Sequence, residues 1–139
     1  MRWNASGTRL AWTRTTGKVA HWSIGDGVTV THCDGRHVFW LRGDEDRFVH
    51  YQGADGAISR CDLATGEPRP VSTRLPRGQV AEVHEDPASD DVIATIHGGG
   101  ILASCFVLRG GLSGTPLRLS RSSMTCGPWV PGTTSVDPR

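Results

Sequence analysis

Residues 46–67 read DRFVHYQGADGAISRCDLATGE, and this stretch decides how the chain folds. An apolar and aromatic run from Phe48 to Tyr51 is followed by the turn signal Asp55-Gly56, and from Ile58 to Leu63 apolar and polar residues alternate. Two short runs with period two on either side of a glycine-bearing turn predict a β-hairpin. A helix would need apolar residues three and four positions apart over ten or more residues, which this stretch lacks.

The same hairpin design occurs twice more along the chain, over residues 7–27 and 91–108. Superposing the three segments requires offsets of 39 and 44 residues. In that register each segment places apolar residues at the same positions, namely Val19, Trp22 and Ile24, then Ile58, Cys61 and Leu63, then Leu102, Cys105 and Val107. The chain is therefore an internal repeat, and the fold must be one that stacks similar units.

The stretches between the hairpins, 28–41 and 71–83, also alternate, so each unit of about 40 residues has room for four short strands. We expect an all-β fold made of four-stranded antiparallel blades, arranged as part of a β-propeller. The partial propeller is predicted over residues 1–118, with units at about 1–27, 28–70 and 71–118. Residues 119–139 are predicted to form a Gly/Pro/Ser-rich tail.

These repeats resemble a known family. Residues 55–67 are similar to the hairpin and exit turn of WD-repeat and TolB-type β-propeller blades, and residues 4–11 are similar to the turn and strand that open such a blade. The resemblance covers about 105 residues, from Trp3 to Leu108. Trp22-Ser23 and Cys61-Asp62 stand where strict WD repeats carry Trp-Asp, and the Gly-His opener is missing, which favours the looser TolB-type pattern.

Propellers close with four to eight blades, whereas this chain provides about three. An open arc exposes apolar blade faces and unpaired strand edges. We therefore expect that the chain is a fragment of a longer propeller, or that oligomerisation with further copies completes the ring.

Composition and charge exclude several classes of protein. The 139 residues are 37% hydrophobic and carry a net charge of +1, with a basic start, an acidic middle and a basic end. The basic residues are scattered rather than gathered on one dense face, so a nucleic-acid partner is not expected. No apolar run reaches the roughly 18 residues of a membrane-spanning helix. The first residues lack the apolar stretch of a signal peptide, which predicts a cytoplasmic protein.

The family resemblance implies a non-enzymatic module for protein interaction or ligand sensing, which binds a protein or peptide partner through loops on one face of the ring. The candidate binding residues are Asp55, Arg60 and His97. No cofactor and no metal ion are expected. The cluster of acidic residues around His84 lacks the regular ligand spacing of a calcium loop and is predicted to be a solvated turn.

A compact trypsin-like serine hydrolase is the alternative. The segments around His32, Asp91 and Ser113 resemble those that carry the base, the orienting carboxylate and the nucleophile of that family, in the family's chain order. Only 22 residues separate Asp91 from Ser113, and only 26 follow Ser113, which is too short for the second barrel of such an enzyme. The segment His97-Gly98-Gly99-Gly100 matches an esterase oxyanion motif, but the chain lacks the nucleophile elbow that accompanies it. An enzyme is therefore the less favoured reading.

The cysteines and tryptophans are expected to be structural. The four cysteines, Cys33, Cys61, Cys105 and Cys126, contain no C-x-x-C pair, and we expect buried thiols rather than a disulfide or zinc framework. Four tryptophans, Trp3, Trp12, Trp22 and Trp40, lie in or beside predicted strands, where aromatic side chains usually pack between sheets.

Overall fold

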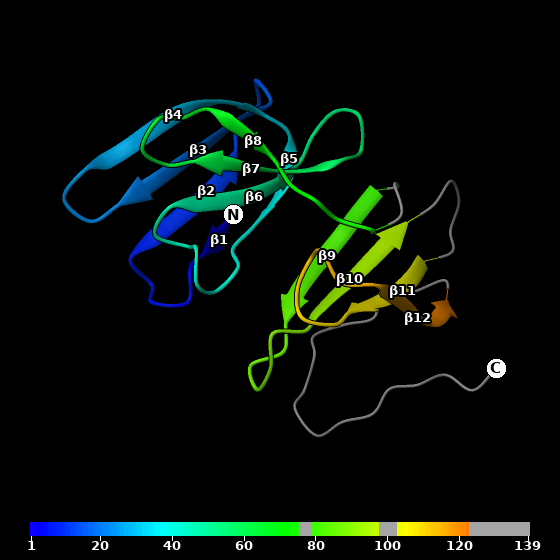
Figure 1. The fold of residues 1–139 in the computed structure, drawn as a ribbon. Helices are drawn as coiled ribbons and strands as arrows, with labels where there is room; N and C mark the ends of the chain where they lie inside the picture. The colour runs from blue at the N-terminus through cyan, green and yellow to red at the C-terminus, as the bar shows by residue number, and fades with distance from the viewer. Residues whose placement is uncertain (76–78, 98–102, 123–139) are drawn as a thin grey trace. The chain divides into compact units, whose positions relative to one another are not determined.

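The computed structural model describes residues 1–75, 79–97 and 103–122, and these residues form strands, turns and no helix (Figure 1). The strands form three four-stranded antiparallel sheets, so the predicted all-β class and its four-stranded units are confirmed. In the described residues, no helix is long and apolar enough to cross a membrane.

Each sheet is a meander in which consecutive strands are neighbours. The first sheet contains β1 (Arg2–Trp3), β2 (Arg9–Thr13), β3 (Lys18–Ser23) and β4 (Gly27–Asp34). The second contains β5 (Arg36–Phe39), β6 (Phe48–Gln52), β7 (Ile58–Asp62) and β8 (Pro68–Pro70). The third contains β9 (Gln79–Glu85), β10 (Val92–His97), β11 (Ala103–Leu108) and β12 (Pro116–Ser122).

The sheets thus run over residues 2–34, 36–70 and 79–122. The sequence-based units were placed at 1–27, 28–70 and 71–118, but strand β4 over 27–34 pairs with β3 and completes the first sheet. Strand β12 extends into the segment predicted as tail, and residues 123–139 lie outside the described part. The chain divides into two compact units, 1–71 with the first two sheets and 72–139 with the third.

The predicted correspondence between the first two hairpins holds in their hydrogen bonds. The Arg14 amide donates to the Lys18 carbonyl at 2.8 Å, and at the equivalent position the Gly53 amide donates to the Ala57 carbonyl at 2.9 Å. Gly17 and Gly56 occupy the same turn position with φ of +86° and +82°, a backbone region that favours glycine. The glycine of each turn therefore fixes the register of its hairpin.

The third hairpin departs from the predicted register. The Asn4 amide donates to the Arg9 carbonyl and the Asp86 amide to the Asp91 carbonyl, so the first sheet matches the third with Arg9 equivalent to Asp91. In this alignment the cross-strand pair of Val92 and Leu108 matches the cross-strand pair of Leu10 and Trp22. Position 108 rather than Cys105 is thus equivalent to Trp22. The predicted equivalence of Cys105 was wrong, because the pairing of β10 with β11 from Val92 to His97 is two residues longer than the pairing of β2 with β3 from Leu10 to Thr13, while five residues separate the last paired residues in both hairpins. Residues 98–102, which include the candidate oxyanion glycines, lie outside the described part.

The core of the first unit lies between its two sheets. The inner face of the first sheet contributes Ala11, Val19 and Cys33, and the second sheet contributes Val38, Val49, Tyr51 and Cys61. Trp40 packs against this cluster, and its indole N–H donates to the Arg2 carbonyl at 2.9 Å. Trp3, by contrast, is 56% exposed, so the expectation that it packs in the core was wrong.

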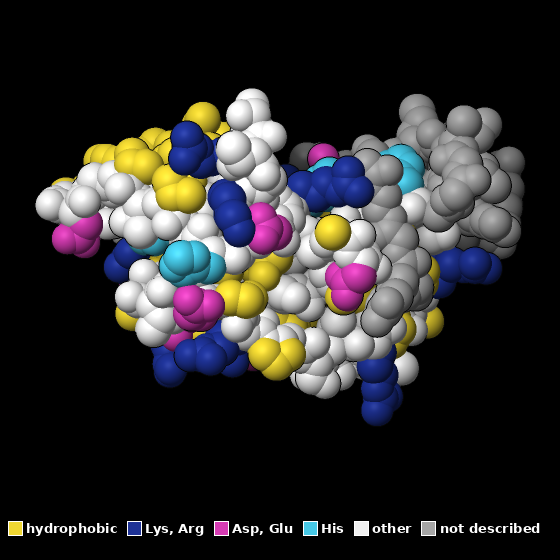
Figure 2. Space-filling model, turned by 90° about the horizontal axis from the view of Figure 1, so that it is seen from above, with side chains coloured by type: hydrophobic (Ala, Val, Ile, Leu, Met, Phe, Trp, Pro, Cys, Tyr) yellow, Lys and Arg dark blue, Asp and Glu magenta, His cyan; other side chains and the backbone are white. Residues whose placement is uncertain are grey.

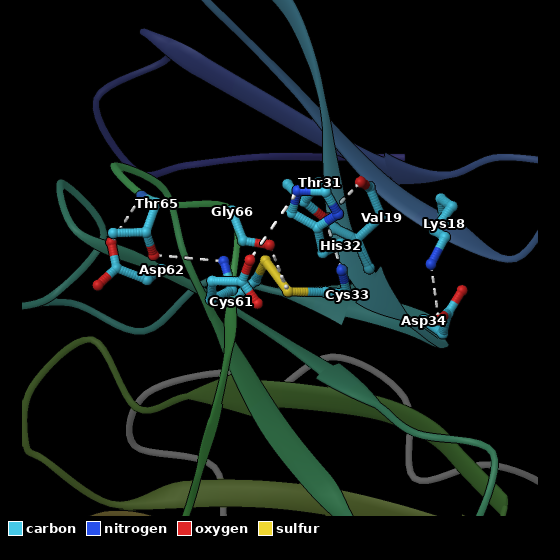
Figure 3. A network of polar contacts seen from close by, with 11 residues as sticks. Lys18, Val19, Thr31, His32, Cys33, Asp34, Cys61, Asp62, Thr65 and Gly66 are labelled. Atoms are coloured by element: carbon cyan, nitrogen blue, oxygen red, sulfur yellow. Dashed lines mark hydrogen bonds and ion pairs between the residues drawn. A yellow bond between two sulfur atoms is a disulfide. The ribbon is translucent and has the colours of Figure 1, made fainter.

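A disulfide joins the two sheets of this unit. Cys33 on β4 is bonded to Cys61 on β7, and both residues are fully buried. Beside the bond, the His32 amide donates to the Gly66 carbonyl at 2.8 Å, and the Thr31 hydroxyl donates to the Val19 carbonyl at 2.7 Å (Figure 3). The expectation of unpaired buried thiols was therefore wrong. The two cysteines are 28 residues apart in sequence, and only the packing of one sheet on the other brings them together.

Candidate functional site

The candidate site lies on the second sheet, around Arg60. Its guanidinium carbon lies 4.0 Å from the centroid of the Phe48 ring, a cation–π geometry. Its Nη1 is 3.9 Å from a carboxylate oxygen of Asp44, and its side chain is 38% exposed. Across the strands, Arg60 on β7 is paired with His50 on β6, whose ring stacks on Phe39 of β5 at 5.3 Å between centroids. We call these five residues the Arg60 cluster.

The strand pattern of the second sheet explains why these side chains meet. Phe39, His50 and Arg60 are directly opposite one another on three neighbouring strands, so their side chains share one face. Phe48 is two residues from His50 on the same strand and therefore points to that face as well. Asp44 is placed by the turn before β6, where its carbonyl accepts hydrogen bonds from the amides of Arg47 and Phe48.

Two further arginines flank Arg60. The Arg47 guanidinium carbon lies 4.9 Å from the centroid of the Phe48 ring. Arg69 on β8 is the cross-strand partner of Arg60. Both side chains belong to exposed residues. Two guanidinium groups thus lie at one buried aromatic ring and a third arginine lies on the strand next to Arg60, and guanidinium groups bind carboxylates and phosphates through paired N–H donors.

His50 is a neutral member of the Arg60 cluster. Burial lowers its pKa to about 4, and the positive charge of Arg60 adds to this effect. Its Nε2 lies 4.0 Å from the Asp44 carboxylate, which is too far for a hydrogen bond and, with a neutral ring, is no ion pair. His50 Nδ1 and Arg60 Nε make no hydrogen bond within the described part of the chain. The histidine therefore supplies an apolar stacking surface at neutral pH rather than a charge.

The other predicted binding residues are placed elsewhere. Asp55 lies in the turn between β6 and β7, where its carboxylate accepts the Ala57 amide at 3.0 Å and so stabilises its own turn. His97 ends β10, opposite Ala103 in the register of the third sheet. Asp55 and Arg60 belong to the first compact unit and His97 to the second. Among contacts between described residues, Arg60 is the one of the three that has a cluster of polar and aromatic neighbours around it.

Two residues of the hydrolase alternative, His32 and Asp91, lie beside groups other than each other. His32 Nε2 lies 3.9 Å from a carboxylate oxygen of Glu67. The Asp91 carboxylate accepts the Gly110 amide at 3.0 Å and lies 3.5 Å from the Arg109 guanidinium. Ser113 is exposed in the turn between β11 and β12. These contacts give Asp91 a role in closing its own sheet rather than in orienting an imidazole.

The acidic residues around His84 are also occupied locally. His84 Nε2 lies 3.2 Å from a carboxylate oxygen of Glu82. The Asp86 carboxylate accepts the Ala88 amide and the Ser89 hydroxyl, both at 2.9 Å. Over residues 1–75, 79–97 and 103–122, no group of three or more His, Cys, Asp or Glu side chains is arranged to hold a metal ion.

Sequence reasoning singled out Arg60 but missed its neighbours. The available signal was the hairpin register, because a turn at Asp55-Gly56 places residue 50 opposite residue 60 and residue 48 opposite residue 62. The approach of Asp44 could not be found in this way, since it depends on the loop before β6.

Comparison with known proteins does not supply an identity. A scan against models of known protein families finds no family that matches this chain. A search of curated proteins finds no match either.

Proposed function

We propose that this chain is a β-propeller-like module of the looser TolB type that binds a protein or peptide partner and does not catalyse a reaction. Its three similar four-stranded sheets support the blade-like reading. On this proposal further blades, from a longer chain or from other copies, complete the ring.

We further propose that the partner presents carboxylates to the Arg60 cluster. The observation that carries this proposal is the position of Arg60, which is held over Phe48 and still 38% exposed. A guanidinium that is stacked on an aromatic ring has lost much of its conformational freedom, so less entropy is lost when it binds a ligand. Arg47 and Arg69 add positive charge around it. An acidic peptide fits this arrangement by charge and by the geometry of its carboxylates.

A titration with a labelled hexaglutamate peptide at low salt tests this proposal. We expect the wild-type chain to bind it and Arg60→Met to bind at least fivefold more weakly, because methionine keeps the apolar stem but loses the charge. Arg14→Met is the matched control, since Arg14 is an exposed arginine in a turn of the first sheet. Equal losses in the two variants, or no binding to the wild type, would contradict the proposal. Labelling of Ser113 by a serine-directed phosphonate would contradict its non-enzymatic part.

The compartment of the protein is part of the same proposal. The sequence predicts a cytoplasmic protein, and that prediction is in tension with the buried Cys33–Cys61 bond. Disulfides persist in oxidising compartments and are rare in the cytosol of most organisms. We therefore favour an oxidising compartment. Acid quenching of cells followed by alkylation under denaturing conditions tests this, because a cytosolic pool would then carry modified Cys33 and Cys61, which are buried in the folded chain.

A further inference from the structure

The first half of strand β4 is an open edge of the first sheet. Among the described strands β4 pairs with β3 alone, and Figure 1 shows it at the border of its sheet. Val28 and Val30 are 62% and 44% exposed. Further along the strand the edge is covered by the turn between β7 and β8, since the His32 amide donates to the Gly66 carbonyl at 2.8 Å. A main-chain contact with the edge of β4 therefore already exists at His32, and it stops short of Val30.

The hydrogen-bond register shows which backbone groups of β4 point to this open edge. In an antiparallel pair of strands, hydrogen-bonded and non-hydrogen-bonded residue pairs alternate. The Arg14 amide donates to the Lys18 carbonyl, so the even-numbered residues of β3 direct their N–H and C=O groups to β2. Ala20 is one of them, and its partner Val30 therefore directs its own N–H and C=O groups away from β3, as does Val28. No hydrogen bond from another described residue reaches these groups on the open side.

The other edge strands of the three sheets carry features that prevent pairing with another chain. Strand β1 has two residues, β5 is short and irregular, and β8 contains two prolines in three residues. Strand β9 carries two glutamates, and β12 begins with proline and carries two arginines. Short length, irregular register, proline and charge all protect a sheet edge. Residues 27–31 of β4 read GVTVT and lack all of these features, so this edge retains the capacity to pair.

We propose that the first half of β4 binds an extended, uncharged peptide segment of a partner protein, which adds one strand to the first sheet. An extended backbone matches this edge because its N–H and C=O groups recur on one side at every second residue, as those of Val28 and Val30 do. Val28 is opposite Trp22 on the face away from the core, and Val30 points to the same face. Figure 2 shows hydrophobic side chains gathered at the surface over the first sheet. The bound segment extends these apolar rows, so it should carry apolar residues at alternate positions.

The charges around this edge favour an uncharged segment over an acidic one. Residues 27–31 carry no charge, and Lys18 and Asp34 further along the strand pair are bonded to each other at 2.8 Å. The site is separate from the Arg60 cluster, which lies on the second sheet, so it goes beyond the function proposed above. A further blade would pack on a face of the first sheet, whereas this segment pairs with its edge. The contact therefore does not depend on completion of a ring.

Amide hydrogen exchange of the full chain, measured by NMR with and without the peptide acetyl-SVTVTVS-amide, tests the register of this contact. In the free chain we expect the Val28 and Val30 amides to exchange rapidly, because they point to the open edge. The Thr29 amide points to β3 and should exchange slowly with or without the peptide. Saturating peptide should slow exchange at Val28 and Val30, which is the alternation that a paired strand produces and that a side-chain contact does not.

A fluorescence anisotropy titration with the labelled peptide tests the same contact by substitution. Val30→Pro removes the N–H group on the open edge and leaves the hydrogen bonds to β3 in place, and it should weaken binding by about fivefold or more. Val30→Thr is the matched control, because threonine keeps the N–H group and the β-branched shape, and it should bind nearly as the wild type does. Far-UV circular dichroism shows whether each variant is folded. If Val30→Pro does not fold, the exchange of Val28 and Val30 in the wild type decides the question.

Several outcomes would overturn the proposal. They are a wild type that does not bind the peptide, unchanged exchange at Val28 and Val30 when it is bound, and a folded Val30→Pro variant that binds normally. Self-association of the wild type that Val30→Pro abolishes would also overturn it, because a second copy would then occupy the edge. Two crossed measurements separate this proposal from the previous one, since Arg60→Met should bind this peptide normally and Val30→Pro should bind hexaglutamate normally.

Discussion

Removing the Cys33–Cys61 disulfide by the double substitution Cys33→Ala/Cys61→Ala is expected to lower the free energy of unfolding by about 3.5 kcal/mol. The bond closes a loop between residues 28 positions apart, and a cross-link of that length reduces the entropy of the unfolded chain by about 12 cal/mol/K. Alanine is preferred to serine because both positions are fully buried, and serine would add two buried hydroxyl groups.

Urea unfolding without reductant, followed by tryptophan fluorescence, measures this effect. With a slope of about 1.5 kcal/mol/M, the loss corresponds to a fall of about 2.3 M in the urea midpoint. Reductant alone does not isolate this bond, since Cys105 is also disulfide-bonded. The reduced wild type is therefore the control, and it should be destabilised at least as much as the double variant.

Two results would refute the reasoning about the disulfide. One is a urea midpoint that falls by less than about 0.5 M in the double variant. Such a small change would mean that the unfolded chain is already compact without the bond, so that the cross-link removes little of its entropy. The other is a non-reducing tryptic digest in which residues 19–36 are not linked to residues 61–74. Trypsin leaves the second peptide intact at Arg69 because proline follows it.

Three further perturbations test single contacts. His50 has its pKa lowered from 6.5 to about 4 by burial and by the charge of Arg60, so between these pH values the unfolded chain binds a proton that the folded chain does not. The free energy of unfolding should therefore be fully retained above pH 6.5 and fall by about 3 kcal/mol as the pH drops to 4. His50→Gln should flatten this part of the profile of urea midpoint against pH. Gly35→Ala should lower the free energy of unfolding by about 3 kcal/mol, because the new Cβ would overlap the Gln52 carbonyl oxygen and the Tyr51 ring. Gly43→Ala, at a glycine with φ of +90° and open space around it, should lower it by only about 1 kcal/mol. Equal losses in urea unfolding would contradict the predicted clash at Gly35. Asn4→Ala should cost about 1–2 kcal/mol, since the buried Asn4 side-chain oxygen accepts the Thr8 and Arg9 amides at 3.0 Å, whereas Asn4→Asp keeps that acceptor and should lose less in thermal unfolding.

The sequence by itself determined the local structure of this protein. Alternation with period two, together with glycines such as Gly17 and Gly56 at positions of positive φ, fixed the first two hairpins and the alignment of one on the other. These features depend on residues that are close in the chain, where backbone conformation and hydrogen bonding decide the outcome. The third hairpin was placed in the wrong register because its paired strands are two residues longer, and a longer strand keeps the same alternation while it moves the equivalent positions along the chain.

The tertiary structure alone decided which faces of the sheets are covered. Alternation separates the side chains of a strand into two sets but does not say which set meets another sheet, so Trp3 was expected in the core and lies exposed. The four cysteines allow three pairings, and the bond between Cys33 and Cys61 depends on the packing of β4 against the second sheet. Arg60 could be predicted as a binding residue from the sequence. The approach of Asp44 to Arg60 could not be predicted, because it depends on how the loop before β6 lies on the second sheet. Contacts between sheets join residues that no local pattern connects.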